Sequence, residues 1–139
     1  MTRYDHVENE MKIINDVEDN DFSKLVKEIL DSIESIHIDG RAGTGKSTLI
    51  KMLQAEMEKR EISFISLAPT NKACRIINGQ TIHRFVASNQ ILKDKRITHI
   101  FIDEVSMMCE AFYKYFIVLK RMRPELIYII AGDLNNYYQ

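Results

Sequence analysis

The sequence predicts a three-layer α/β fold with a mainly parallel sheet. Two observations lead to this class: short apolar runs alternate with segments of helical periodicity, and a glycine-rich loop stands between the run at 35–39 and the next helical segment. Alternating strands and helices form β-α-β units with right-handed crossovers, which make the strands parallel and place helices on the faces of the sheet. A chain of 139 residues is long enough for one such domain with one sizeable core.

The expected elements follow in order from the N-terminus. Residues 1–20 are acidic and without periodicity, so we interpret them as a loose lead-in to one domain at 21–139. Apolar positions recur at helical spacing between residues 22 and 33, and a short apolar strand follows at 35–39. The next predictions are a helix at 47–59, a buried strand at 62–68 that Pro69 ends, and a short helix at 71–78 that Gly79 ends.

The second half of the chain continues the alternation. Residues 92–96 are polar and basic, and we predict a surface loop there. An apolar strand is expected at 97–102, a helix at 110–123 and a last strand at 126–131. The helix carries four aromatic residues at helical spacing, which favours core packing over a base-stacking platform for Phe112, Tyr113, Tyr115 and Phe116.

Composition and charge narrow the class of protein. No apolar run approaches the roughly 20 residues of a membrane helix, and residues 1–21 carry too many charges for a secretory signal. The two cysteines, Cys74 and Cys109, do not suffice for a zinc site. We therefore expect no membrane partner and an intracellular location: cytoplasm, nucleus or a viral replication site. Residues 1–34 have a net charge of −6, whereas residues 35–139 have a net charge of +5. The positive charge of the second part suits a polyanionic partner.

The glycine-rich loop, GRAGTGKS at residues 40–47, fits the pattern G-x-x-x-x-G-K-[ST] of a phosphate-binding loop. Its glycines let the backbone bend around an anion, and the helix that follows adds the positive end of its dipole. Lys46 would reach the β- and γ-phosphates, and the Ser47 hydroxyl would bind Mg²⁺. The predicted ligand is ATP with Mg²⁺, and the predicted nucleotide-binding residues are Gly40, Ala42, Gly43, Thr44, Gly45, Lys46, Ser47 and Thr48.

Two carboxylates, Asp103 and Glu104, follow the apolar run at 97–102. A parallel strand presents its carboxyl end to the crevice where ligands bind. An Asp at this place can hold Mg²⁺ through water, and a Glu beside it can orient and deprotonate the attacking water. Ser47 and Asp103 are therefore the predicted metal residues, and Lys46 and Glu104 the predicted catalytic residues of a nucleotide hydrolase.

Five segments together resemble the motifs I, Ia, Ib, II and the start of III of superfamily 1B DNA helicases, the RecD-like and PIF-type enzymes that include viral forms. They read GRAGTGKST at 40–48, APTNKA at 68–73, GQTIHRF at 79–85, IDEVSMM at 102–108 and AGD at 131–133. The resemblance covers about residues 35–136. It implies a RecA-like P-loop NTPase domain whose four expected strands, numbered along the chain, have the order 1-4-3-2.

The same resemblance implies further site residues. Asp133 of motif III would lie beside the nucleotide, and single-stranded DNA would be the nucleic-acid partner, bound weakly by this length of chain. The residues along its track would be Pro69, Thr70, Asn71, Thr81 and His83. Attraction to the DNA backbone would come from Lys72, Arg75, Arg84, Lys93, Lys95 and Arg96. The alternative without a DNA role is a solvated loop for the basic run at 93–96. For His83 it is a core or surface histidine whose hydrogen bonds are made within the protein.

Several departures from the family pattern bear on function. Motif III of the family reads G-D-x-x-Q, whereas Asn136 stands at the glutamine position here and Gln139 follows three residues later. Motifs IV, V and VI and the second RecA-like domain do not follow within the sequence, so we expect them to be missing or supplied by a partner chain. The outer edge of the strand at 35–39 would then lack a neighbour. Two alternatives remain open: a non-motor ATP-binding regulatory or scaffold module, and a nucleotide kinase.

Overall fold

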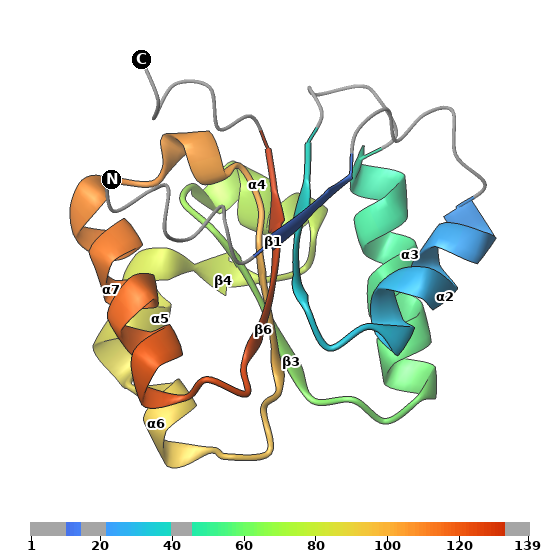
Figure 1. Cartoon of the computed structure of the whole chain (residues 1–139). Helices are drawn as coiled ribbons and strands as arrows, with labels where there is room; N and C mark the ends of the chain where they lie inside the picture. Colours follow the sequence, from blue (N-terminus) through green and yellow to red (C-terminus); the bar gives the residue numbers. More distant parts are fainter. Residues whose placement is uncertain (1–10, 15–21, 40–45, 133–139) are drawn as a thin grey trace.

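The computed structural model describes residues 11–14, 22–39 and 46–132, and it confirms the predicted α/β class (Figure 1). Six strands, all parallel to their neighbours, form one sheet in the order β1-β2-β6-β5-β3-β4. Their bounds are β1 Met11–Ile14, β2 Ser35–Ile38, β3 Phe64–Ala68, β4 Gln80–Thr81, β5 His99–Ile102 and β6 Ile127–Ala131.

Helices cover both faces of this sheet, as Figure 1 shows. One layer consists of α2, α3 and α4, which pack with Ile36, Phe101 and Ile129 of the sheet. The other consists of α5, α6 and α7, which pack with Leu67, Ile100 and Ile130. The helices span α2 Phe22–Asp31, α3 Lys46–Lys59, α4 Asn71–Ile76, α5 Ile82–Ser88, α6 Gln90–Lys93 and α7 Glu110–Met122, with a 3-10 turn η2 at Val105–Met107.

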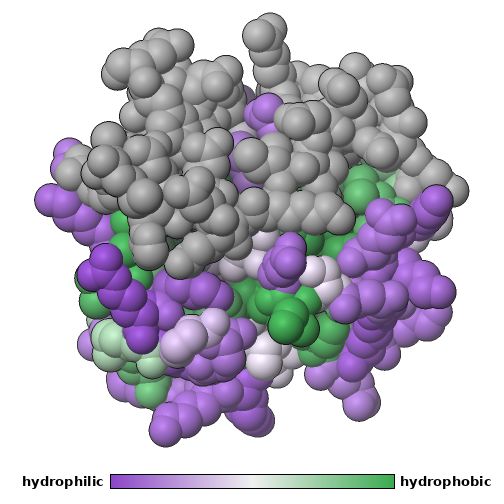
Figure 2. Space-filling view, in the orientation of Figure 1, coloured by the Kyte–Doolittle hydropathy of each residue, from purple (hydrophilic) through white to green (hydrophobic). Residues whose placement is uncertain are grey.

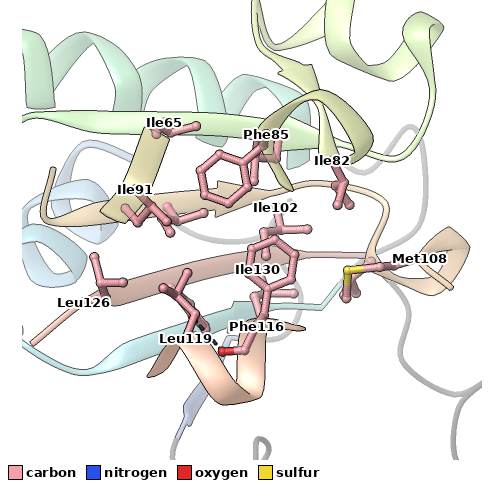
Figure 3. Packing of buried hydrophobic residues seen from close by; sticks show 14 of the residues in the cluster. Ile65, Ile82, Phe85, Ile91, Ile102, Met108, Phe116, Leu119, Leu126 and Ile130 are labelled. Atoms are coloured by element: carbon pink, nitrogen blue, oxygen red, sulfur yellow. Dashed lines mark hydrogen bonds between the residues drawn. The ribbon is translucent and has the colours of Figure 1, made fainter. Parts of the chain in front are cut away.

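The two cores follow from the alternation of side chains along a strand. In β6, Ile129 and Ala131 belong to the core under α2, α3 and α4, whereas Tyr128 and Ile130 belong to the core under α5, α6 and α7. Figure 3 shows the second core, in which side chains from β3, β5, β6 and the covering helices meet. Burying one such aliphatic side chain stabilises the fold by about 1.5–3 kcal/mol.

The strand order predicted from the sequence is confirmed. The four expected strands correspond to β2, β3, β5 and β6, and β6 lies between β2 and β5. Two further strands extend the sheet, because β4 pairs with β3 and β1 pairs with β2. The expectation that the strand at 35–39 lacks an outer neighbour is therefore wrong: Met11 to Ile14 pair in register with Ser35 to Ile38.

Three smaller expectations are also corrected. The helix expected to reach residue 33 ends at Asp31, and the side chain of Ile33 is 87% exposed instead of joining the apolar face. The surface loop expected at 92–96 begins inside α6, which ends at Lys93. Helix α5 and strand β4 were not expected at all. Within the described parts of the chain, no helix has the length and apolar character needed to cross a bilayer.

Candidate nucleotide and nucleic-acid site

The predicted site residues that the structure describes gather at one edge of the sheet, which we call the carboxyl edge because the strands end there. All six strands are parallel, so β2, β6, β5, β3 and β4 deliver the residues that follow them to this same edge. Lys46 begins α3 after the loop that follows β2, and Asp103 comes directly after β5. Thr70 follows β3, and Thr81 is the last residue of β4.

Lys46 and Asp103 form a buried ion pair at this edge. The Nζ atom of Lys46 lies 3.4 Å from Oδ1 of Asp103, and the two side chains are only 9% and 7% exposed. The same carboxylate oxygen accepts a hydrogen bond of 2.8 Å from the backbone N–H of Glu104. Each buried charge is therefore compensated by the other, which offsets a desolvation cost of several kcal/mol per ion.

The turn that carries Glu104 has an unusual backbone. Glu104 has φ 52° and ψ 46°, the left-handed region that side chains other than glycine seldom adopt, and its side chain is half-buried. Gly132, at the end of β6, lies against this turn with φ 122°. A Cβ atom at Gly132 would be 3.1 Å from the backbone nitrogen of Val105. The close approach of β6 and the acidic turn thus requires glycine at this position.

His37 on β2 is a residue of this region that the sequence analysis missed. Its side chain is 4% exposed, and its Nε2 lies 2.8 Å from the carbonyl oxygen of Gly132. Because a carbonyl only accepts, Nε2 carries the proton and donates it. Among the described residues, Nδ1 of His37 has no hydrogen-bond partner. The available signal was a basic side chain inside an otherwise buried strand, SIHI.

Part of the predicted nucleotide site lies outside the described residues. Ser47 and Thr48 stand exposed in the first turn of α3, next to the buried Lys46. The remaining predicted nucleotide-binding residues, and the two alternatives for the motif III glutamine, fall in segments that the structure does not describe: Gly40, Ala42, Gly43, Thr44, Gly45, Asp133, Asn136 and Gln139.

The predicted DNA residues occupy the β3 and β4 side of the carboxyl edge. Thr70 is exposed and caps α4, since its Oγ1 accepts a hydrogen bond of 3.2 Å from the N–H of Ala73. Thr81 caps α5 in the same way, accepting 3.2 Å from the N–H of Arg84. Capping uses an acceptor site of each oxygen and leaves the hydroxyl hydrogen able to donate. Pro69 is half-buried between β3 and α4, and Asn71 is exposed.

His83 lies on the exposed side of α5 and contacts an aromatic ring of α7. The rings of His83 and Phe112 are 4.6 Å apart at an angle of 88°, an edge-to-face contact. Tyr113 and Phe116 are buried in the core under α5, α6 and α7, so the preference for core packing is confirmed for these two aromatic residues. The residues predicted to attract a DNA backbone are all exposed: Lys72, Arg75, Arg84, Lys93, Lys95 and Arg96.

Comparisons with known proteins give this arrangement a family. A family model described as "AAA domain" matches residues 20–123. The ATP-dependent DNA helicase Pif1 of Bdellovibrio bacteriovorus is 30% identical over a 99-residue alignment that covers 58% of this chain and 22% of that protein. Crystal structures of Bacteroides Pif1 bound to ssDNA and of Bacteroides sp Pif1 with ADP-AlF4 are both 21% identical to the chain, with TM-scores of 0.66 and 0.64.

These two structural matches cover 85% and 81% of this chain, but only 32% and 31% of the solved chains. The chain therefore spans less than a third of the length of its relatives. TM-scores of 0.66 and 0.64 show that the matched part of each solved chain shares the fold described above. Because the family model matches well over half of the chain, the chain belongs to the AAA domain family.

Proposed function

We propose that this chain is the ATP-binding part of an ATP-dependent DNA helicase, which in the complete protein hydrolyses ATP to drive translocation along single-stranded DNA. The observation that carries the proposal is the buried pair of Lys46 and Asp103 at the carboxyl edge. Lys46 would be the phosphate-loop lysine and Asp103 the magnesium-holding carboxylate, and both would meet the nucleotide here. The relative from Bdellovibrio bacteriovorus is an ATP-dependent DNA helicase, and one structural neighbour holds ADP-AlF4.

The donor set at this edge fits a magnesium ion carried by the nucleotide. Ser47 offers a hydroxyl oxygen on the first turn of α3, and Asp103 offers a carboxylate whose Oδ2 makes no hydrogen bond to a described residue. Oxygen ligands of this kind, few in number, suit Mg²⁺, which keeps several waters and phosphate oxygens in its shell. No cluster of three or more metal-ligating side chains occurs among the described residues.

Lys46 and Glu104 would do the remaining chemistry. When a nucleotide enters, the ammonium of Lys46 would leave Asp103 for the β- and γ-phosphates and compensate their charge during transfer. Asp103 would then hold Mg²⁺, which neutralises the developing phosphate charge when it is bound. Glu104, held by its turn next to Asp103, would orient the attacking water and accept its proton. Before the nucleotide arrives, the ion pair compensates both buried charges, and the exchange of partners would keep them compensated afterwards.

DNA would bind along the β3 and β4 side of the same edge. The hydroxyls of Thr70 and Thr81 can donate to phosphate oxygens while their oxygens cap α4 and α5. His83 stands beside them on the exposed side of α5. In support, one structural neighbour, Bacteroides Pif1, was solved bound to ssDNA. With both ligands on one edge, ATP hydrolysis would be coupled directly to the movement of DNA, because motifs on adjacent strands would bind both ligands.

An intracellular location remains a prediction.

The alternative of a non-motor ATP-binding module is not favoured, because the relative and the structural neighbours all carry the name Pif1. The two functions differ in turnover. ATP hydrolysis that single-stranded DNA stimulates is expected of the motor, whereas a regulatory module would bind nucleotide without turnover. We expect turnover by the 139-residue chain alone to be slow, because an arginine finger contributes on the order of 10³–10⁵ in rate and no motif of this chain supplies one.

The test is calorimetric titration of ATP with Mg²⁺ into the chain and its Lys46→Ala variant. Losing the charged contact of Lys46 should weaken ATP binding by about 10- to 150-fold, since such a contact contributes about 1.5–3 kcal/mol. The control is Lys51→Ala, which removes an exposed lysine from the same helix and should leave the affinity unchanged. Equal affinity of the Lys46→Ala variant and the unchanged chain would overturn the proposal.

A further inference from the structure

A wide groove that contains four cationic side chains begins at β4, beside the carboxyl edge. It follows α5 from its first turn, passes α6 and ends at the connection that leads into β5. Its volume is about 1130 Å³. Its lining, which defines the basic groove, consists of Gln80, Arg84, Ser88, Gln90, Lys93, Asp94, Lys95 and Arg96. Figure 2 shows hydrophilic residues gathered over the α2–α3 side and, separately, over the lower end of the other helical layer, where Figure 1 places α6.

Arg123 holds the backbone between α6 and β5, which carries part of the groove lining. The guanidinium of Arg123, only 11% exposed, donates to the carbonyl oxygens of Ile91, Lys95 and Ile97 at 3.0, 3.3 and 2.9 Å. With the carbonyls of this connection turned toward Arg123, the side chains of Lys93, Lys95 and Arg96 stand exposed to solvent. On the opposite wall, the Gln80 side chain donates to that of Gln90 at 3.4 Å, which ties β4 to α6.

The charge of the groove is largely uncompensated. Four cations against one carboxylate leave a net charge of +3. The carboxylate, Asp94, is already bound by Arg96 through two bonds of 3.0 and 3.2 Å, which lower its pKa and keep it ionised. Among the described residues, no carboxylate forms a salt bridge with Arg84, Lys93 or Lys95. These three cations are therefore available to an external polyanion.

We propose that the basic groove binds the phosphodiester backbone of DNA and continues the DNA track of the proposed function beyond Thr81. The proposal rests on that function for the identity of the polyanion. Continuity with the track comes from α5, since Thr81 caps this helix and Arg84, one turn later, lines the groove. None of the five segments that resemble helicase motifs contains Lys93, Lys95 or Arg96, so the groove adds a binding segment that those motifs do not assign.

The lining also indicates how the groove would read its ligand. The cations are spread along an open surface instead of converging on one point, which suits a chain of phosphates better than a single phosphate group. Among the described residues, no aromatic side chain lines the groove, so these residues offer a base nothing on which to stack. Binding would thus be independent of base sequence, and its free energy would come from the release of counterions from the phosphates.

The test is the salt dependence of DNA affinity, measured by fluorescence anisotropy on the 139-residue chain with a labelled single strand of mixed sequence. For single strands, log K falls with log salt by about 0.7 per phosphate neutralised. The variant Lys93→Ala/Lys95→Ala should therefore reduce the slope by about 1.4. The charge-preserving variant Lys93→Arg/Lys95→Arg should keep the original slope. The matched control is Lys27→Ala/Lys59→Ala, which removes two exposed lysines from α2 and α3 on the opposite face.

The outcomes separate this inference from the proposed function. A slope that is the same for Lys93→Ala/Lys95→Ala and the unchanged chain, while DNA still binds, would overturn the groove and leave the track intact. A slope that falls equally in the Lys27→Ala/Lys59→Ala control would also overturn it, because the effect would then follow total charge. The absence of DNA binding at low salt by the unchanged chain would overturn the groove and the track together. The variant Thr70→Ala/His83→Ala tests the track alone, and it should lose DNA affinity while its ATP affinity stays unchanged.

Discussion

At the residue scale, the ion pair of Lys46 and Asp103 links folding to ligand binding. Among the described residues, these are the buried side chains that are charged at neutral pH, and each is the other's partner. A nucleotide with Mg²⁺ would offer both ions new partners of opposite charge, so binding would exchange compensated states without exposing a bare charge. Under the proposed function, the ligand itself would offset the cost of separating the pair, and the carboxyl edge would favour a ligand that brings both a metal and phosphates.

His37 gives the first residue-scale prediction. Its Nε2–H group donates to the carbonyl of Gly132, where β6 ends beside the acidic turn, and its Nδ1 has no hydrogen-bond partner among the described residues. His37→Phe removes the donor and leaves a buried carbonyl without it, so the free energy of unfolding should fall by about 1–3 kcal/mol. His37→Gln can place an amide N–H near the same carbonyl and should recover part of the loss. Urea unfolding at pH 7 measures both, and equal losses for the two variants would contradict the assigned hydrogen bond.

His99 gives a prediction about pH. Burial lowers the pKa of this histidine, which lies at the start of β5 with its Nδ1 2.8 Å from the Thr98 hydroxyl. In the unfolded chain the ring takes up a proton near its ordinary value of about 6.5, whereas the folded protein resists that proton. The unfolded state then binds more protons, so the free energy of unfolding should fall as the pH drops below about 6.5. In His99→Gln this part of the pH dependence should be smaller, which urea unfolding at pH 5.5 and 7.5 would detect.

At the element scale, the sequence predicted the strands with long apolar runs and missed the short strands β1 and β4, together with helix α5. Strands β3, β5 and β6 are buried along most of their length, and their apolar runs predicted them to within two residues. Strand β4 has two polar residues and no hydrophobic signal, whereas β1 has a short apolar run, MKII, inside an acidic segment. The phosphate loop and the acidic pair were predicted because spacing fixes their chemistry, whereas the contact of His37 with Gly132 joins residues 95 positions apart.

Arg123 gives the element-scale prediction, because one side chain holds the connection between α6 and β5. Its guanidinium donates to three backbone carbonyls and to Glu125, and a hydrogen bond to a charged group makes a net contribution of about 1.5–3 kcal/mol. Arg123→Ala should lower the free energy of unfolding by at least about 1.5 kcal/mol and speed proteolysis near residues 91–97. Arg121→Ala is the matched control, since this exposed arginine belongs to the same helix and should change stability by less than about 0.5 kcal/mol.

At the scale of the whole molecule, the sheet is protected at both ends by short strands. β4 has two residues and β1 has four, so neither edge offers a long row of free N–H and C=O groups to another chain. Between them lie strands whose side chains are buried, including all four residues of β2. The outer strand β1 comes from the segment that the sequence analysis treated as a lead-in, and it covers the edge of β2 that was expected to lack a neighbour.

The last prediction tests this protection by removing β1. A chain of residues 15–139 would leave the edge of β2 unpaired, and the free N–H and C=O groups of Ser35–Ile38 would be open to pairing with a second copy. Its solution mass by light scattering should therefore rise with concentration, and its free energy of unfolding should be lower than that of the full chain. The matched control is a chain of residues 11–139, which shortens the N-terminus but keeps Met11–Ile14 on β2. If the two shortened chains have the same mass and stability, β1 does not protect the sheet, and self-association would have to be sought at the β4 edge.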